Sequence, residues 1–210
     1  MTAALTPDQI ADHFTRSDGS YLFARWGRPV APIVFGVDDA TLATVKGAIE
    51  AVVTLAGHQM AETDPELGVN LLVFFCRDWD ELLAVPDLDR LVEGLGPTVA
   101  RLRAAGANQY RAFRFDAAGA IKAAFVFVRM DAAMQDTPAA DIALLQAVQT
   151  IVLWSERAFA DRSPLIRAKG VAVLRPEIAA LIAAAYDRVM PAQATDPSHA
   201  LRLAARLTAT

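Results

Sequence analysis

The sequence predicts an α+β fold in a single domain. Two short apolar runs of strand length flank a long segment with helical periodicity, a β-hairpin pattern with a glycine turn follows, and helical patterns fill the last third of the chain. This order of β-α-β, hairpin and C-terminal helices predicts a mixed sheet of about four strands packed with helices. Because the 210-residue chain contains no compositional linker, we expect residues 1–210 to form one domain.

The β-α-β unit is predicted in the first half of the chain. Residues 31–37, APIVFGV, form an apolar run that ends at Asp38, which indicates a buried strand followed by a helix N-cap. The helix that follows has one apolar stripe, made by Leu42, Val45, Ile49, Val52, Val53, Ala56 and Met60. Residues 69–75, VNLLVFF, are apolar on both faces and therefore predict a central strand.

Short helices are predicted next, from their end signals. Asp78 and Glu81 have the spacing of a capping box, and Pro86 with Asp87 predicts a second helix start. A further helix is expected within residues 97–106, between a proline and a glycine. These clustered carboxylates lack the spacing of a calcium loop, so capping explains them better than metal binding.

The hairpin pattern carries the arginines that we consider first as ligand-binding residues. Residues 109–115, QYRAFRF, and 120–128, AIKAAFVFV, read as strands that turn at Gly119. Strand alternation puts Arg111, Phe113 and Phe115 on one face and Tyr110, Ala112 and Arg114 on the other. The aromatic residues therefore do not form an open basic platform for nucleic-acid bases. We expect Arg111 and Arg114 to edge a half-buried hairpin that can hold a small anionic ligand.

A second candidate for ligand binding precedes the first strand. Arg25 and Trp26 lie in YLFARWGRPVAP, just before the apolar run of residues 31–37. They can form a pocket rim, or the segment can lead into the strand with Trp26 packed inward. Both interpretations stay open from the sequence.

Three helices are expected at the C-terminal end, at about residues 139–160, 176–190 and 197–207. In the first, we expect the polar residues Gln146, Gln149 and Glu156 to face water. Its buried face is predicted to consist of Leu144, Val148, Ile151, Val152 and Phe159. The last helix has its leucines, Leu203 and Leu207, four residues apart, so it can dock on its own domain or on a second copy of the chain, and a homo-oligomer stays open.

Composition excludes several classes of function. The formal net charge of −4 and pI near 5.4 argue against nucleic acid as a partner. No apolar run reaches the roughly 18–20 residues of a membrane span, so no membrane association is expected. Asp8, Asp12 and His13 interrupt the start where an export signal would be apolar, which predicts a cytoplasmic location. Arginine makes up 17 of the 20 basic residues, a bias typical of high-GC bacterial genomes.

Residues that often carry chemistry are few. Cys76 lies in an apolar run and is expected to be a buried thiol. The three histidines lack metal-ligand spacing, so no metal and no cofactor is expected. We expect His58 to be an exposed helical residue and His199 a surface residue of a first helical turn. Glycine-rich phosphate loops and the G-x-S-x-G nucleophile motif do not occur in the sequence.

Several segments, taken in order, resemble an uncharacterised bacterial family of unknown function. They are FARWGRPVAPIVFGV, VNLLVFF, the hairpin, ALLQAVQTIVLW and LRPEIAALIAAAYDRVMP, within residues 20–190. The layout of that family is similar to the zincin type of metallopeptidase. A working zincin carries two histidines four residues apart, with a glutamate between them, on the helix after the hairpin. Here that segment has Gln146, Gln149 and Glu156 and no histidine, so the resemblance implies a zincin-like layout without the peptidase metal.

Two hypotheses of function follow. The leading one is a non-catalytic binding or accessory domain for a protein partner or a small anionic ligand. The alternative is a hydrolase or peptidase-like enzyme with dispersed residues such as His58, Asp78 and Glu62. The enzyme requires a histidine that lines a cleft with a carboxylate within hydrogen-bond reach.

Overall fold

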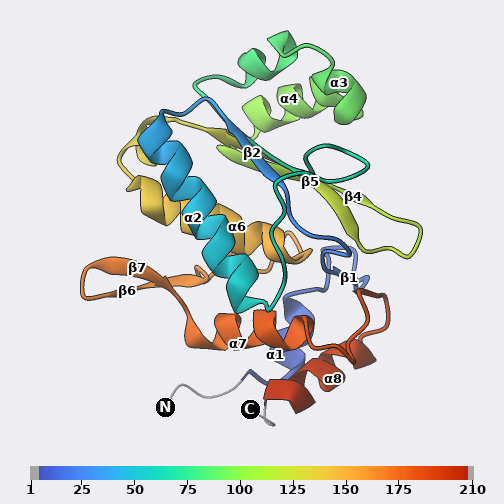
Figure 1. Cartoon of the computed structure of the whole chain (residues 1–210). Coiled ribbons are helices and arrows are strands. Elements are labelled where there is room, and N and C mark those ends of the chain that lie inside the picture. Colours follow the sequence, from blue (N-terminus) through green and yellow to red (C-terminus); the bar gives the residue numbers. More distant parts are fainter. Residues whose placement is uncertain (1–4, 208–210) are drawn as a thin grey trace.

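The structure, a computed structural model, describes residues 5–207 and is built around a four-stranded mixed sheet (Figure 1). The strand order is β2-β3-β5-β4, where β2 is Pro32–Phe35, β3 is Leu71–Cys76, β5 is Ile121–Arg129 and β4 is Gln109–Phe115. Strands β2, β3 and β5 run parallel, and β4 pairs antiparallel with β5 at the edge. The predicted α+β fold with a mixed sheet of about four strands is confirmed.

Helices cover both faces of this sheet, which explains why β3 and residues 123–128 of β5 are apolar throughout. On one face α2 (Asp39–Leu55) and α6 (Ala139–Ile151) pack on each other and on the sheet. The other face is covered by the 3₁₀-helix η1 (Trp79–Ala84), α3 (Leu88–Leu91) and α4 (Leu95–Ala104). In β3 and β5, alternate residues therefore enter two separate cores, each large side chain contributing about 1.5–3 kcal/mol.

Local signals in the sequence account for several of these elements. Asp38 caps α2 by accepting a hydrogen bond from the Thr41 amide at 2.7 Å. The capping box of Asp78 and Glu81 forms at η1, as predicted. Asp87 does precede α3, but its backbone is left-handed and its side chain forms an ion pair with Arg90 instead of a cap.

The hairpin of β4 and β5 forms where it was predicted. Asp116 accepts hydrogen bonds from the Ala118 and Ala120 amides at 2.9 and 3.0 Å, which closes the turn. Gly119 has a φ of +78°, which disfavours any other residue type. The side of Gly119 that a Cβ would occupy faces Gln193, so the turn also contacts the C-terminal part of the chain.

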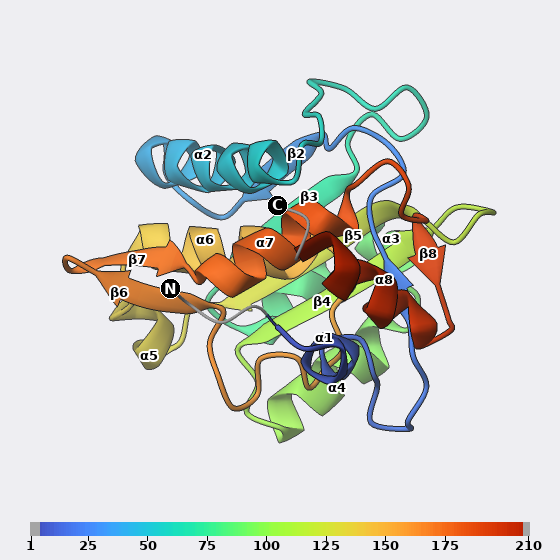
Figure 2. The ribbon, with the colours of Figure 1, turned by 90° about the horizontal axis from the view of Figure 1, so that it is seen from below.

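A group of smaller elements completes the domain below the sheet in Figure 1 and lies in front of it in the view from below (Figure 2). It contains α1 (Pro7–Asp12), α7 (Pro176–Ala185) and α8 (Ser198–Leu207), with the short pair β1 (Phe23–Ala24) and β8 (Gln193–Ala194). The hairpin of β6 (Leu165–Ala168) and β7 (Val171–Leu174) and the short α5 (Ala132–Gln135) lie nearer α6. Helix α8 packs against α1 and α7, and its Leu203 is fully buried. Docking of α8 on its own domain is thus observed.

Three expectations about the C-terminal helices are wrong. Helix α6 ends at Ile151, not near residue 160, and α7 ends at Ala185, not at residue 190. His199 was expected at the surface, yet it is only 2% exposed. The reason is that α8 turns this residue toward β1, where its Nδ1 lies 2.8 Å from the Tyr21 hydroxyl and its ring packs on Phe23.

Among residues 5–207, none of the helices has the length and apolarity needed to cross a bilayer.

The Cys76 thiol is expected to be unreactive in the folded protein. It is 5% exposed, as predicted, and burial together with the charges of Glu81 and Asp78 raises its pKa to about 11. Because the thiolate is the nucleophile, Ellman's reagent at about pH 7.5 should label no thiol in the native protein and one per chain in guanidinium chloride. Rapid labelling of the native protein would contradict the burial of this side chain.

His199 should make folding stability depend on pH. Burial, with a smaller effect of Arg202, lowers its pKa from the ordinary 6.5 to about 4. The unfolded chain therefore binds a proton before the folded protein does, and stability is lost as pH falls from about 6.5 to about 4, by up to about 3 kcal/mol.

The measurement is denaturant unfolding at a series of pH values for the wild type and for His199→Gln, whose side chain can still hydrogen-bond Tyr21 but does not titrate. The variant should lose less stability over this interval. Equal pH dependence of the two proteins would contradict the role of His199. Comparing the two proteins also removes the contributions of His13 and His58, whose pKa values burial lowers as well.

Candidate ligand-binding cleft

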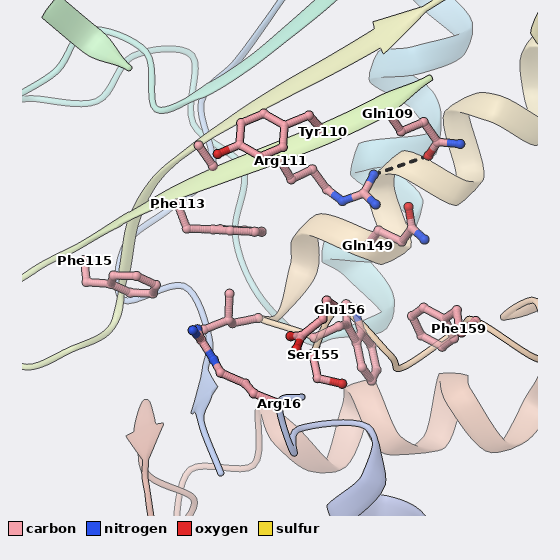
Figure 3. Close-up of a pocket in the computed structure, with 14 residues that line it drawn as sticks. Arg16, Gln109, Tyr110, Arg111, Phe113, Phe115, Gln149, Ser155, Glu156 and Phe159 are labelled. Carbon is pink, nitrogen blue, oxygen red and sulfur yellow. Dashed lines mark hydrogen bonds between the residues drawn. The ribbon is translucent and has the colours of Figure 1, made fainter. Parts of the chain in front are cut away.

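An open cleft of about 690 Å³ lies between β4 and the segment of residues 152–160 that follows α6 (Figure 3). Strand β4 forms one wall, α6 contributes Gln149, and the 152–160 segment forms the opposite wall. The side chains labelled in Figure 3 are Arg16, Gln109, Tyr110, Arg111, Phe113, Phe115, Gln149, Ser155, Glu156 and Phe159. The cleft is therefore built from Arg16, from β4 and from residues 149–160, which are three parts of the chain that are distant in sequence.

The end of α6 creates the wall opposite β4. Three aromatic side chains donate hydrogen bonds to the last carbonyls of this helix. The Trp154 indole donates to the Val148 carbonyl at 2.8 Å. The Trp26 indole donates to Thr150 at 2.8 Å, and the Tyr186 hydroxyl donates to Ile151 at 2.7 Å. Because these carbonyls are satisfied by side chains, the chain can leave the helix at Val152.

Beyond α6, the wall is tied to the N-terminal part of the chain. Val152 forms an antiparallel bridge with Arg25, and the Leu153 amide donates to the Ala24 carbonyl at 2.8 Å. The Ser155 amide donates to the His13 carbonyl at 2.9 Å. The Trp154 ring stacks on the Phe14 ring with centroids 5.4 Å apart. Backbone and ring contacts thus fix the wall, which favours a preformed cleft.

A polar cluster joins β4 to α6 at one end of the cleft. The Arg111 Nη1 donates to the Gln146 side-chain oxygen at 2.8 Å and to the Gln109 oxygen at 3.4 Å. The Gln146 amide donates to the same Gln109 oxygen at 2.8 Å. Gln146 is only 3% exposed, so the expectation that it faces water is wrong. The edge strand β4 crosses α6 at this point, and the glutamine meets the arginine there.

Arg111 has no acidic partner in the part of the chain that the structure describes. Its contacts with Gln109 and Gln146 supply oxygen acceptors but no negative charge. Burial lowers the pKa of its guanidinium to about 10, so the group stays charged at neutral pH. Its Nε and Nη2 make no hydrogen bond within residues 5–207, and they keep access to the cleft.

The lining of the cleft is more positive than the chain as a whole. Its charged residues are Arg16, Arg111 and Glu156, two cations and one anion, while the chain has a net charge of −4. Glu156 accepts a hydrogen bond from the Ser17 amide at 2.5 Å, and hydrogen bonding from Ser17 lowers its pKa. This carboxylate is therefore held at the wall, and the cleft favours a negatively charged ligand.

The four residues predicted to bind a ligand do not share one pocket. Arg111 lines the cleft, whereas Arg114 points to the opposite face of β4 and donates to the Leu91 carbonyl at 2.5 Å. Trp26 is 1% exposed and packs inward, the second of the two interpretations of its segment. The Arg25 guanidinium lies over the Tyr186 ring at 5.1 Å. Arg25 and Trp26 thus support the wall of the cleft from behind.

The residues proposed for a hydrolase are not brought together. His58 follows α2 on one side of the sheet and hydrogen-bonds the Arg28 carbonyl at 2.8 Å, while Asp78 caps η1 on the other side. Glu62 is exposed. His58 is half-buried and lies beyond the end of α2, so its expected position on an open helix face is wrong.

The three histidines are hydrogen-bonded to a tyrosine or to backbone groups. None lines the cleft, and none hydrogen-bonds a carboxylate within residues 5–207. In the same residues, no three side chains among histidine, cysteine, aspartate and glutamate are grouped to hold a metal ion.

The chain matches no family model, no curated protein and no solved structure. The resemblance to a zincin-like layout therefore stays a prediction.

Sequence reasoning missed Gln109 and Gln146, which hold Arg111 in place. The sequence nevertheless contained one indication that Gln146 is buried. Gln146 and Gln149 interrupt a helix whose other residues from 142 to 152 are apolar except Thr150, and such helices bury more than one face. A polar residue on a helix of this kind is a candidate for a buried hydrogen bond.

Two substitutions on α6 should separate the structural glutamine from the one facing the cleft. Gln146→Leu should lower the free energy of unfolding by about 1–3 kcal/mol, because Arg111 and Gln109 lose a buried partner. Gln149→Leu is the matched control. The Gln149 oxygen is buried without a partner in the described residues, so its removal should change stability by less than about 0.5 kcal/mol or increase it. Denaturant unfolding followed by circular dichroism measures both, and equal losses would contradict this assignment.

Proposed function

We propose that the protein is a non-catalytic binding domain that holds an extended segment of another polypeptide along β4. The observation that carries this proposal is the open edge of β4 beside the cleft. An extended peptide can add to such an edge as a new strand, with main-chain hydrogen bonds for affinity and pockets for alternate side chains.

The register of the hairpin identifies which backbone groups are free. The Arg129 amide donates to the Asn108 carbonyl at 2.8 Å, so the pair 108/129 is hydrogen-bonded. Hydrogen-bonded pairs alternate along an antiparallel ladder, and Tyr110 and Ala112 therefore face β5. The backbone N–H and C=O of Gln109, Arg111 and Phe113 point away from β5. No partner strand pairs with them in the described part of the chain.

The side chains of the same three residues line the cleft. A segment paired with this edge would direct every second side chain into the cleft. There it would meet Phe113, Trp154 and Phe159, whose rings provide apolar contact area, and the guanidinium of Arg111. A volume of about 690 Å³ is in the range of ordinary ligand sites.

Two features favour binding over hydrolysis. The charged side chains that line the cleft are arginines and one glutamate already hydrogen-bonded to Ser17. Acid–base catalysis of hydrolysis would need a group within reach of the ligand that gives up and takes back a proton near neutral pH. A half-buried arginine with a pKa of about 10 does not do so.

The proposal predicts a pattern with a period of two in the ligand. Peptides would be selected on the immobilised protein from a phage-displayed random library, and the best binder would be resynthesised with single N-methylated amides. Amides that face β4 should lose about 10-fold or more in affinity when methylated, and the amides between them should tolerate it. Isothermal titration calorimetry measures the affinities.

A matched pair of protein variants tests the main-chain hydrogen bonds from the side of β4. Phe113→Pro removes an outward N–H, while Phe113→Val removes the ring and keeps the N–H, so only the proline should abolish the hydrogen bond. Absence of any selected binder, or methylation effects without alternation, would contradict the proposed function.

A further inference from the structure

We infer that Arg111 is a specificity-determining residue that reads a carboxylate side chain, aspartate or glutamate, on the bound segment. This inference rests on the proposed function and names the class of peptide that the cleft takes. It is carried by the free edge of the Arg111 guanidinium, by its lack of an acidic partner, and by its position on β4.

Only one of the three nitrogens of the Arg111 guanidinium makes hydrogen bonds within the described residues. Among the described residues, both hydrogen bonds of this guanidinium are made by Nη1, with Gln146 and Gln109. The Nε–H and one Nη2–H of an arginine are parallel and fit the two oxygens of a carboxylate. Because Nη1 is held by the two glutamines, this free edge has a fixed orientation toward the cleft. A carboxylate could therefore bind in bidentate fashion without reorganising the side chain.

Within residues 5–207, no acidic side chain pairs with the charge of Arg111. The ion pairs of the described residues include eight other arginines and one lysine, and none of them involves Arg111. The other cationic residue of the lining is Arg16, and the one acidic residue, Glu156, is engaged with Ser17. An acidic ligand would supply the missing charge in a partly desolvated site, where such a pair is stronger than at an open surface.

The position on β4 selects one residue of the ligand. The backbone groups of Arg111 point outward to the added strand, and its side chain is on the cleft face. Residues directly opposite one another in a strand pair project to the same face, about 4.5–5.5 Å apart at their Cβ atoms. The acidic side chain is therefore expected at the ligand position that pairs with Arg111, and not elsewhere along the segment.

A double-mutant cycle tests this inference. The probe is the peptide selected from the random library, together with versions in which each Asp or Glu is changed singly to Asn or Gln. The protein variants are Arg111→Gln and, as matched control, Arg114→Gln on the opposite face of the same strand. Arg111→Lys is included because it keeps the charge and loses the fork, so it reports on geometry even if the glutamine variant folds poorly. Circular dichroism and thermal unfolding verify the fold of each variant.

We expect one peptide carboxylate whose replacement lowers affinity about 10- to 100-fold for the wild type and has little effect for Arg111→Gln. Arg111→Lys should lose most of the preference for the acid over the amide, and Arg114→Gln should keep it. The coupling between that carboxylate and Arg111 in the cycle should place the two side chains in contact.

The inference and the proposed function fail in different ways. If binders show alternating N-methylation effects but carry no acidic residue, or prefer the acid equally with Arg111→Gln, the inference is overturned while the proposed function stands. If no peptide of the library binds, or the alternation is absent, both are overturned.

Discussion

The aromatic hydrogen bonds that end α6 are the constraint on which the cleft depends. Trp26, Trp154 and Tyr186 satisfy the carbonyls that a longer helix would have used, and the chain is free to turn at Val152. Burial raises the pKa of the Tyr186 phenol, so its hydroxyl keeps the proton that it donates to Ile151. The turn brings the 152–160 segment under β4 and creates a wall facing the edge of the sheet. Without it, residues 152–160 would continue along the axis of α6.

The polar cluster at Arg111 is the counterpart of this wall on the sheet side. Most arginines of the described chain form ion pairs or bind backbone carbonyls, and these contacts join elements of the fold. Arg111 is held by two glutamines, which fix its direction and leave its charge available. A partly buried cation without a counter-ion lowers the stability of a free protein, and such arrangements are concentrated where proteins bind or react.

The sequence was sufficient for the parts of the fold that rest on local signals. Asp38 at the start of α2, the capping box of Asp78 and Glu81, and Gly119 in the hairpin act within a few residues of themselves. The parts that could not be predicted depend on distant contacts. The Trp26 indole and the Tyr186 hydroxyl reach carbonyls 124 and 35 residues away, so two of the three side chains that end α6 are distant from it in the sequence.

The same distinction applies to the candidate site and to the smaller elements. Helical periodicity predicted that Gln146 faces water, because the sequence alone does not show that β4 crosses α6 at this residue. His199 was misplaced because its partner, Tyr21, lies 178 residues away. Strands β1 and β8 have two residues each, which is too short for any alternation to be recognised. The face of β4 that carries Arg111 was assigned correctly because a seven-residue strand is long enough for its alternation to be recognised.

An unpaired strand edge also has a consequence for how the protein behaves at high concentration. Strand β4 is rich in aromatic residues, and an open strand of this kind invites pairing with the same strand of another molecule, the first step toward aggregation. Arg111 on one face of β4 and Arg114 on the other oppose this, because two copies brought edge to edge would set like charges close together. We therefore expect the arginines of this strand to disfavour self-association through this edge and to attract the proposed acidic ligand.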